Sequence, residues 1–256
     1  MINLFTTLMI NRIKVFLDLK LTGSIGTKNS FMRDEWVKSQ LLCLDKDQKI
    51  LDAGAGESQY KKYCTHLKYT AHDISIYDGI GNLKGIQKGD RNYSSIDIIS
   101  DIYDIPVANE TFDAILFTEV LEHLTDPVKV FNELNRILKK EGTLIMTAPF
   151  NSLTHYSPYH YSTGFTINFY EYHLQKFGFE IISIEPNGNY FDYISQELRR
   201  INSISTKYSN LKLGFIYKIS IKILLNFMKI ATKSDSGSSE LLCYGYHVKC
   251  KKVNSL

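Results

Sequence analysis

The chain has 256 residues, of which 44% are hydrophobic and 22% are charged, and its formal net charge is +3. This composition is ordinary for a soluble globular protein and excludes a largely disordered chain. Lysine and arginine are spread along the sequence without a block of like charges, so we expect no nucleic-acid partner. The four cysteines form no C-x-x-C pair, and we expect reduced thiols in a cytoplasmic protein without a bound metal.

The N-terminal region is predicted to be mainly helical. Apolar residues recur there at three- and four-residue spacing, namely Ile2, Phe5, Met9, Ile13 and Phe16. Polar residues interrupt the apolar run and no small-residue cleavage site follows it, so we interpret it as an amphipathic helix and not as a signal peptide. A glycine-containing break separates it from a second helix, predicted for residues 34–44.

A glycine-rich turn follows the first predicted strand, in the stretch KILDAGAGESQY. Glycine has no Cβ and tolerates positive φ, so Gly54 and Gly56 allow a ligand to approach the backbone closely. The dinucleotide fingerprint G-x-G-x-x-G also follows a first strand, but Gln59 stands where its third glycine belongs. Asp52 and a second acid at Asp73 are better suited to a ligand that carries an ammonium group and a ribose.

Strands and helices alternate from Ile50 to Phe150, which predicts parallel strands joined by right-handed crossovers. The later strands are predicted at residues 69–72, 96–100, 114–117 and 143–148. A helix is predicted from Asp126 to Gly142, because Asp is a preferred N-cap and Gly a common C-cap. The glycine-containing loop after the second strand is predicted to be a flap or a surface excursion. Ligands of such sheets bind at the carboxyl ends of the strands.

The segment after the fifth strand, PFNSLTHYSPYHYSTGF, is rich in aromatic side chains with polar tips. A fold does not need so many of them in a loop, so we predict a binding role. Because the ordinary pKa of imidazole is about 6.5, a histidine here is the candidate general base. A histidine that bonds only to backbone is the alternative. The candidates are His155 and His160 for catalysis and Tyr156, Tyr159 and Tyr161 for substrate binding.

The last third of the chain is predicted to contain more helices and a final strand. The predicted elements are helices at residues 167–177, 193–203 and 213–230 and strands at residues 179–184 and 241–251. In the helix at 213–230 the lysines share a narrow stripe and the rest of the circumference is apolar. Such a helix must bury most of its surface. We expect packing within the protein or in a homodimer, with peripheral membrane association as the alternative.

Five motifs stand in an order that is known from one class of enzymes: ILDAGAG, YTAHDIS, DIISDIYDIP, FDAILFTEVLEHL and LNRILKKEGTLIMTAP. The chain therefore resembles class I S-adenosylmethionine (SAM)-dependent methyltransferases. The resemblance implies an α/β Rossmann-like fold whose seven-stranded sheet is mostly parallel, with the last strand antiparallel and beside the fifth. It also implies an N-terminal helical cap, residues 1–44, and a methyltransferase domain, residues 45–256, with a helical insertion around residues 190–232.

The resemblance implies that the cofactor is SAM and the product S-adenosylhomocysteine. Asp52 would meet the ammonium group, Asp73 the ribose hydroxyls and Asp101 the adenine amine. Asp97 is the second choice for the adenine contact. The expected cofactor-binding residues are Asp52, Gly54, Gly56, Tyr60, Asp73, Ile74, Asp101, Ile102, Thr118 and Glu119.

Glu119 and His123 lie four residues apart and would share one face of a helix. We interpret them as a structural pair beside the cofactor, with His123 also reaching the substrate. Half of a metal site is the alternative, but no further ligands stand at helical spacing.

The loop sequence TAPFNSLTHYSPYHYSTGF, together with NGNYFDYISQELRR, is similar to methyltransferases associated with bacterial surface-polysaccharide biosynthesis. This likeness implies O-methylation of a small-molecule substrate, a sugar or phosphosugar. Sugars suit such a loop because they stack on aromatic faces and offer many hydroxyls. The alternatives are methylation of another small molecule, SAM binding without catalysis, and an NAD(P)-dependent oxidoreductase.

Overall fold

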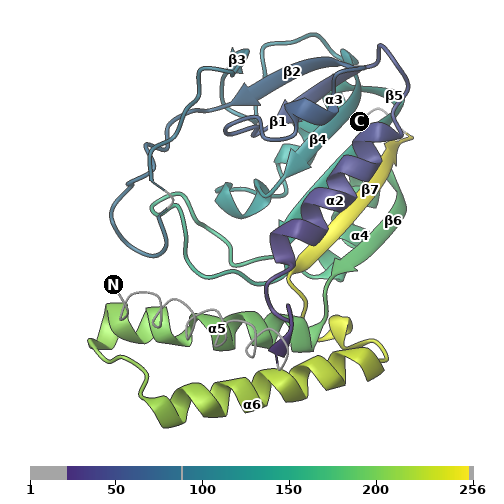
Figure 1. Cartoon of the computed structure of the whole chain (residues 1–256). Coiled ribbons are helices and arrows are strands. Elements are labelled where there is room, and N and C mark those ends of the chain that lie inside the picture. The colour runs from purple at the N-terminus through teal and green to yellow at the C-terminus, as the bar shows by residue number, and fades with distance from the viewer. Residues whose placement is uncertain (1–21, 88, 254–256) are drawn as a thin grey trace, which may run out of the picture. The chain divides into compact units, whose positions relative to one another are not determined.

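The computed structural model describes residues 22–87 and 89–253 (Figure 1). The first predicted helix, with Ile2 to Phe16, lies outside the described residues. The chain divides into two compact units. Among the described residues, one unit comprises residues 22–31 together with Gly188–Cys243, and the other comprises Met32–Asn187 together with residues 244–253.

The larger unit is built on a seven-stranded sheet with the order β3-β2-β1-β4-β5-β7-β6. Neighbours from β3 to β5 pair in parallel, whereas β7 pairs antiparallel with both β5 and β6. The fold class expected from the sequence is therefore confirmed, including the antiparallel last strand beside the fifth. The strands are β1 (Lys49–Ala53), β2 (Lys68–Asp73), β3 (Ile98–Ile99), β4 (Phe112–Thr118), β5 (Leu138–Pro149), β6 (Phe179–Asn187) and β7 (Gly245–Lys252).

Helices cover both faces of this sheet (Figure 1). Trp36 of α2 stacks on His247 of β7, with ring centroids 4.9 Å apart. Tyr170 of α4 lies edge-on to Tyr246 of β7 at 5.9 Å. Consecutive residues of a strand point to opposite faces, so α2 and α4 pack on opposite sides of β7. The helices of this region are α2 (Asn29–Leu42), α3 (Val130–Ile137) and α4 (Ile167–Lys176).

The helix predicted from Asp126 to Gly142 is shorter in the structure. Asp126 caps a turn that precedes the helix, because its Oδ1 accepts from Lys129 N at 3.0 Å, and α3 begins only at Val130. The helix ends at Ile137, since Leu138 is already extended and pairs with Phe112. Gly142 is not a C-cap but lies within β5, where a Cβ would come within 2.8 Å of Leu138 Cδ1.

The smaller unit contains two long helices, α5 (Tyr190–Ser209) and α6 (Phe215–Ala231), as predicted. Asn189 is the N-cap of α5, because its side chain accepts from Asp192 N at 3.0 Å. Arg199 ties α5 to the first described residues by donating to Ile25 O at 2.7 Å and Gly23 O at 3.1 Å. Partly buried hydrogen bonds in this unit thus join segments that are far apart in the sequence.

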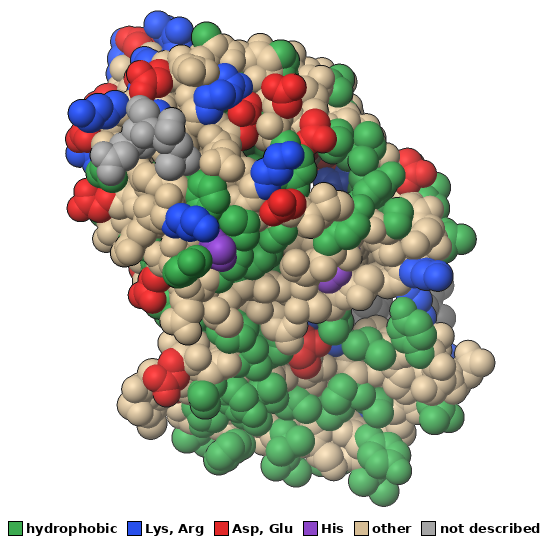
Figure 2. Space-filling view, turned by 180° about the vertical axis from the view of Figure 1, so that it is seen from behind, with side chains coloured by type: hydrophobic (Ala, Val, Ile, Leu, Met, Phe, Trp, Pro, Cys, Tyr) green, Lys and Arg blue, Asp and Glu red, His purple; other side chains and the backbone are tan. Residues whose placement is uncertain are grey.

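The α6 helix leaves most of its apolar surface exposed. Only Leu225 is buried, whereas Phe215 is 77% and Ile216 75% exposed. Figure 2 shows apolar side chains gathered on the surface of this unit, and the exposed ones of α6 are Phe215, Ile216, Tyr217, Ile219, Ile223, Leu224, Phe227 and Ile230. The expected internal packing thus covers only one side of the helix. Within residues 22–87 and 89–253, no helix is long and apolar enough to cross a membrane.

Candidate cofactor and acceptor site

A cavity of about 330 Å³ lies at the carboxyl ends of the parallel strands in the larger unit. Its volume falls within the range of small-molecule sites, which is about 300–1,000 Å³. One part of its lining follows four strands in turn, with Gly54 and Gly56 after β1, Asp73 and Ile74 from the end of β2, Asp101 and Ile102 after β3, and Glu119 and Val120 after β4. The other part comes from two loops and contains Tyr77, Arg91, Tyr156, Tyr159 and Tyr161.

The glycine turn forms the floor of the strand-end part. Gly54 has φ +79°, and a Cβ there would lie 2.4 Å from Val120 Cγ2. Gly56 has φ +55° and donates its N–H to Asp73 Oδ2 at 2.9 Å. The other carboxylate oxygen, Oδ1, accepts from Ser75 N at 2.7 Å. Two backbone amides therefore hold the Asp73 carboxylate at the edge of the cavity.

The two candidates for an adenine contact are placed differently. Asp101 lines the cavity, and its Oδ1 accepts from Tyr103 N at 3.0 Å. Ile102, which follows it, is buried at 6% exposure and also lines the cavity. Asp97 accepts from Ala71 N at 2.8 Å within the sheet and is not part of the lining.

Three expected cofactor contacts, Asp52, Tyr60 and Thr118, do not line the cavity. Asp52 is 1% exposed and accepts a hydrogen bond from the Tyr69 hydroxyl at 2.6 Å. Burial raises the pKa of Asp52 to about 7, and the nearby Asp73 charge adds to this, while the bond from Tyr69 opposes it. Tyr60 donates to Asp34 Oδ1 at 2.8 Å. Asp52 and Tyr60 thus lie behind the glycine turn.

Glu119 lines the cavity from a left-handed backbone conformation, φ 55°. Its Oε2 accepts from Arg33 at 2.6 Å, and its Oε1 accepts from the Thr147 hydroxyl at 2.9 Å. The shared helix face expected for Glu119 and His123 does not exist, because Leu121–His123 forms a 3₁₀ turn. Glu119 is therefore anchored to the sheet and to α2, and His123 has other partners.

The loop part of the cavity depends on pairing between two distant loops. Ile86 N donates to Thr154 O at 2.9 Å, and Tyr156 N donates to Ile86 O at 3.0 Å. The Tyr77 ring also packs on Tyr156, with centroids 4.9 Å apart. The predicted flap after β2 is thus a partner of the aromatic loop, and together the two loops form one wall.

Arg91 is the only lysine or arginine among the residues that line this cavity. Its guanidinium lies 4.8 Å from the centroid of the Tyr156 ring and 5.8 Å from that of Tyr77. The side chain is 11% exposed, its Nη1 lies 3.4 Å from Glu57 Oε2, and its Nε is buried without a partner. Arg91 thus places a positive charge at the wall, beside the carboxylate of Glu57.

Several lining residues were missed by sequence reasoning, including His72, Ile76, Tyr77, Arg91, Tyr93 and Tyr103. Most belong to the long loop after β2, which carries no motif. Its place in the wall depends on contacts with residues that are 70 positions away in the sequence, such as the hydrogen bond that Gln87 Nε2 donates to Ser157 O. For Tyr103 and His72, proximity to the predicted strand ends was the available signal.

The three predicted site histidines lie side by side, but only His123 lines the cavity. Its ring centroid lies 4.9 Å from that of His155, and the rings of His155 and His160 are 4.7 Å apart. Burial lowers the pKa of His123 to about 4 and also lowers the pKa of His160. His160 Nε2 lies 3.1 Å from Ser152 Oγ. In this structure, His155 and His160 thus stand behind the lining.

Comparison with known families finds a match in the core of the chain. Residues 51–146 match the family model of a methyltransferase domain. Among curated proteins, none matches this sequence.

Solved structures share the fold at low identity. The cyclase SpnF has 15% identity and a TM-score of 0.52, over 87% of this chain and 80% of SpnF. Phosphoethanolamine N-methyltransferase 2 from Haemonchus contortus, solved with SAM, has 16% identity and a TM-score of 0.51, over 87% of this chain and 52% of that one. A provisionally assigned methyltransferase from Bacillus halodurans has 14% identity and a TM-score of 0.51, over 87% of this chain and 100% of that one.

The matched domain supports a SAM-dependent methyltransferase, and the solved structures show that the fold is shared. The fold by itself does not define the reaction, because one of these structures is a cyclase.

Proposed function

We propose that this protein is a SAM-dependent O-methyltransferase whose acceptor is a sugar or phosphosugar of bacterial surface-polysaccharide biosynthesis. The observation that carries the SAM assignment is the convergence of Gly56, Asp73 and Asp101 on one cavity, within the segment that matches a methyltransferase domain. Gly56 leaves open space toward the cavity, since a Cβ there would meet only Arg91 Nη1 at 3.7 Å. The residues present therefore fit SAM.

We assign the roles from strand end to strand end. Asp73 would hold the ribose hydroxyls, Asp101 the adenine amine, and Ile74 and Ile102 the faces of the adenosine. Gly54 and Gly56 would lie against the methionine part. When bound, SAM supplies an electrophilic methyl group on a sulfonium, and the protein positions the acceptor and excludes water.

The aromatic wall supports a carbohydrate acceptor. Tyr156, Tyr159 and Tyr161 line the cavity, and tyrosine side chains can stack on a sugar and form hydrogen bonds with it. Arg91 adds a site for a phosphate. Methylation of another small molecule is the alternative, and the test below distinguishes the two.

The general base stays a prediction. His155 or His160 was expected to accept the proton, but each is held by a neighbouring group and neither lines the cavity. Of the three predicted site histidines, His123 is the one that lines the cavity. If a histidine is the base, replacing it with alanine should lower kcat at least about 100-fold with SAM affinity nearly unchanged.

Two measurements test the proposal. SAM and S-adenosylhomocysteine should raise the melting temperature of the protein, and NAD(P) should not, because a ligand stabilises the state that binds it. Turnover of SAM should then be measured with nucleotide sugars, sugar phosphates, polysaccharide fragments and non-carbohydrate phosphates. Stabilisation by NAD(P) alone would exclude a methyltransferase, and turnover only with non-carbohydrates would exclude the sugar assignment.

We propose that the protein forms a homodimer in which the exposed side of α6 is covered by the second copy. We also propose that the protein is cytoplasmic. The large apolar side chains of Phe215, Ile216 and Phe227 support a further contact surface there. Light scattering after gel filtration should give twice the monomer mass, and Phe215→Ser with Phe227→Ser should return it to the monomer. Binding of a monomeric protein to anionic liposomes would favour a membrane surface instead.

A further inference from the structure

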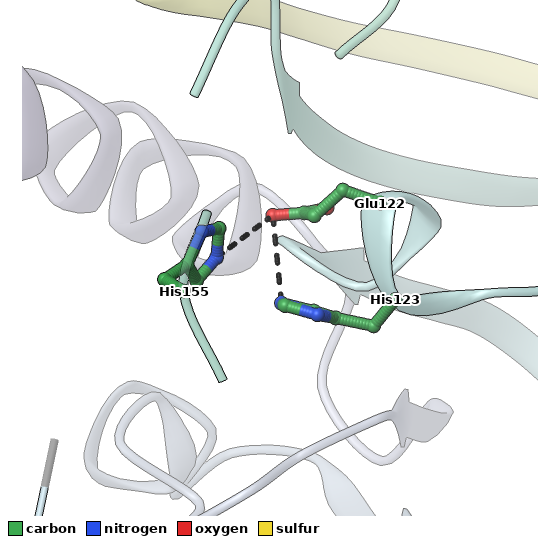
Figure 3. A group of neighbouring side chains, drawn as sticks. All are labelled: Glu122, His123 and His155. Carbon is green, nitrogen blue, oxygen red and sulfur yellow. Dashed lines mark ion pairs between the residues drawn. The ribbon is translucent and has the colours of Figure 1, made fainter. Parts of the chain in front are cut away.

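Three side chains beside the cavity point their polar atoms at one another, as Figure 3 shows. Glu122 Oε1 lies 3.8 Å from His123 Nε2 and 3.9 Å from His155 Nε2. The three atoms all lie within 4.8 Å of one another. Glu122 and His123 come from the 3₁₀ turn after β4 and His155 from the aromatic loop, so the fold and not the sequence spacing brings them together.

The Nδ1 atoms of both imidazoles, which are not the atoms that face Glu122, lie within hydrogen-bond distance of backbone carbonyls. His123 Nδ1 lies 2.6 Å from Tyr159 O, and His155 Nδ1 lies 2.9 Å from Leu153 O. A carbonyl only accepts hydrogen bonds, so both Nδ1 atoms carry the proton and both Nε2 atoms of the neutral rings carry a lone pair. This is the arrangement that orients histidines as metal ligands.

The polar atoms of the three groups make no hydrogen bond to one another. Glu122 is 1% exposed, its Oε2 is buried without a partner, and so is His123 Nε2. The separations of 3.8 and 3.9 Å from Glu122 Oε1 to the two imidazole nitrogens are too long for hydrogen bonds. One cation between them would satisfy all three atoms at once. The surrounding charges are Glu119, Arg33 and Arg91, which act on Glu122 or His123 through space.

We propose that Glu122, His123 and His155 bind one divalent transition-metal ion at the wall of the cavity. Two imidazoles and one carboxylate form a donor set that suits Zn²⁺ and its first-row neighbours and leaves a coordination position open. Ligand atoms at about 2.1 Å from a tetrahedral zinc lie about 3.4 Å apart. The two separations from Glu122 Oε1, 3.8 and 3.9 Å, are close to this value, and the two imidazole nitrogens, within 4.8 Å of each other, need to approach by up to about 1.4 Å. His123 is the ligand that also lines the cavity, so the ion would border the acceptor space.

The role of this ion rests on the function proposed above. An acceptor hydroxyl coordinated to a divalent ion has a lowered pKa and gives its proton to solvent water more readily. The ion would therefore replace a histidine base, which agrees with the position of His155 and His160 behind the lining.

Metal binding is tested without any methyl acceptor. The full-length protein, with its affinity tag removed, is treated with a chelator and dialysed. It is then titrated calorimetrically with Zn²⁺, with Mg²⁺ as a comparison, because Mg²⁺ prefers oxygen ligands. We expect one Zn²⁺ per chain with a Kd of about 1 µM or tighter, and no comparable binding of Mg²⁺. Replacement with Co²⁺ should give a visible spectrum that depends on the same ligands.

Glu122→Gln and His155→Ala should each weaken Zn²⁺ binding by about 100-fold or more, because each removes one of three ligands. His173→Ala on α4 is the matched control, since it removes a partly buried imidazole outside the cluster and should leave the affinity unchanged. Melting curves and SAM binding show which variants are folded. If Glu122→Gln does not fold, the Zn²⁺ affinity of His155→Ala still tests the proposal.

Absence of stoichiometric Zn²⁺ binding, or equal binding by both ligand variants and the wild type, would overturn the proposal. These outcomes are independent of the methyltransferase assignment, which SAM binding and turnover decide.

Discussion

The two parts of the cavity differ in secondary structure, because one lies at the ends of strands and the other is formed by loops. In the strand-end part, Asp73 and Glu119 are held by backbone amides, by Arg33 and by a sheet residue. In the loop part, Arg91 and Tyr156 are held by a few contacts between two loops. The first part is fixed by a regular sheet and the second by contacts that a small change can alter. This difference suits a constant cofactor on one side and a variable acceptor on the other.

The largest expected effect tests how rigid the strand-end part is. Gly54→Ala would place a Cβ 2.4 Å from Val120 Cγ2 at φ +79°, so we expect a loss of about 2–4 kcal/mol in the free energy of unfolding and loss of SAM binding. Gly56→Ala is the matched control, because its φ is also positive but the space beyond it is open. It should cost about 1 kcal/mol, as measured by denaturant unfolding. Equal losses in the two variants would mean that crowding at Gly54 is unimportant.

Asp52 tests whether the region behind the glycine turn is shielded from water. Its folded pKa of about 7 lies above the ordinary value of 3.8, so the folded protein binds more protons, and stability is lost as pH rises between these values. Asp52→Asn removes this penalty while keeping an acceptor for the Tyr69 hydroxyl. The variant should therefore gain about 2–3 kcal/mol relative to wild type between pH 5 and pH 8 in unfolding experiments without ligand. A constant difference across this range would show that Asp52 has an ordinary pKa.

Asp73 and Asp97 separate cavity contacts from sheet contacts. Asp73→Ala should weaken SAM binding by about 1–3 kcal/mol, because it removes a charged acceptor that lines the cavity. Asp97→Ala loses a bond to Ala71 N within the sheet and should reduce stability with little effect on SAM affinity. Calorimetry on both variants checks this, and an equal loss of affinity would remove the distinction between the two acids.

The smallest expected effect tests whether Arg91 belongs to the loop part or to the strand-end part of the cavity. Arg91→Gln should raise KM for an anionic acceptor about 10-fold, which corresponds to about 1.4 kcal/mol, and should leave KM for a neutral analogue unchanged. SAM affinity should also stay the same if Arg91 belongs to the acceptor wall. A parallel loss of SAM affinity would instead assign Arg91 to the cofactor side, where its Nη1 lies near Gly56.

Much of the strand-end part could be predicted from the sequence, because it depends on local order. A buried strand, a glycine turn and an acid at the end of the next strand follow one another within about 25 residues, and parallel pairing places successive strand ends at one edge. Gly54, Gly56, Asp73, Ile74, Asp101, Ile102 and Glu119 all line the cavity as expected. The same reasoning could not tell that Asp52 and Tyr60 lie behind the turn, since exposure depends on what packs against them.

The sequence by itself determined the alternation of strands and helices, which favours parallel pairing, and the aromatic loop, because hydrophobic patterns and turn residues act over short distances. The antiparallel last strand beside the fifth was implied by the resemblance to class I methyltransferases and not by these patterns. Tertiary structure decided the rest. The loop pairing of Ile86 with Tyr156 brought Arg91 to the wall, and the 3₁₀ turn moved Glu122 beside His123 and His155 in place of the predicted Glu119. The periodicity of α6 predicted an apolar helix, but it could not predict that one side of this helix stays exposed. A sequence pattern shows which residues of a helix are apolar and does not show what packs against them. Contacts between residues far apart in the chain carry no local signal, and for that reason they are found only in the folded molecule.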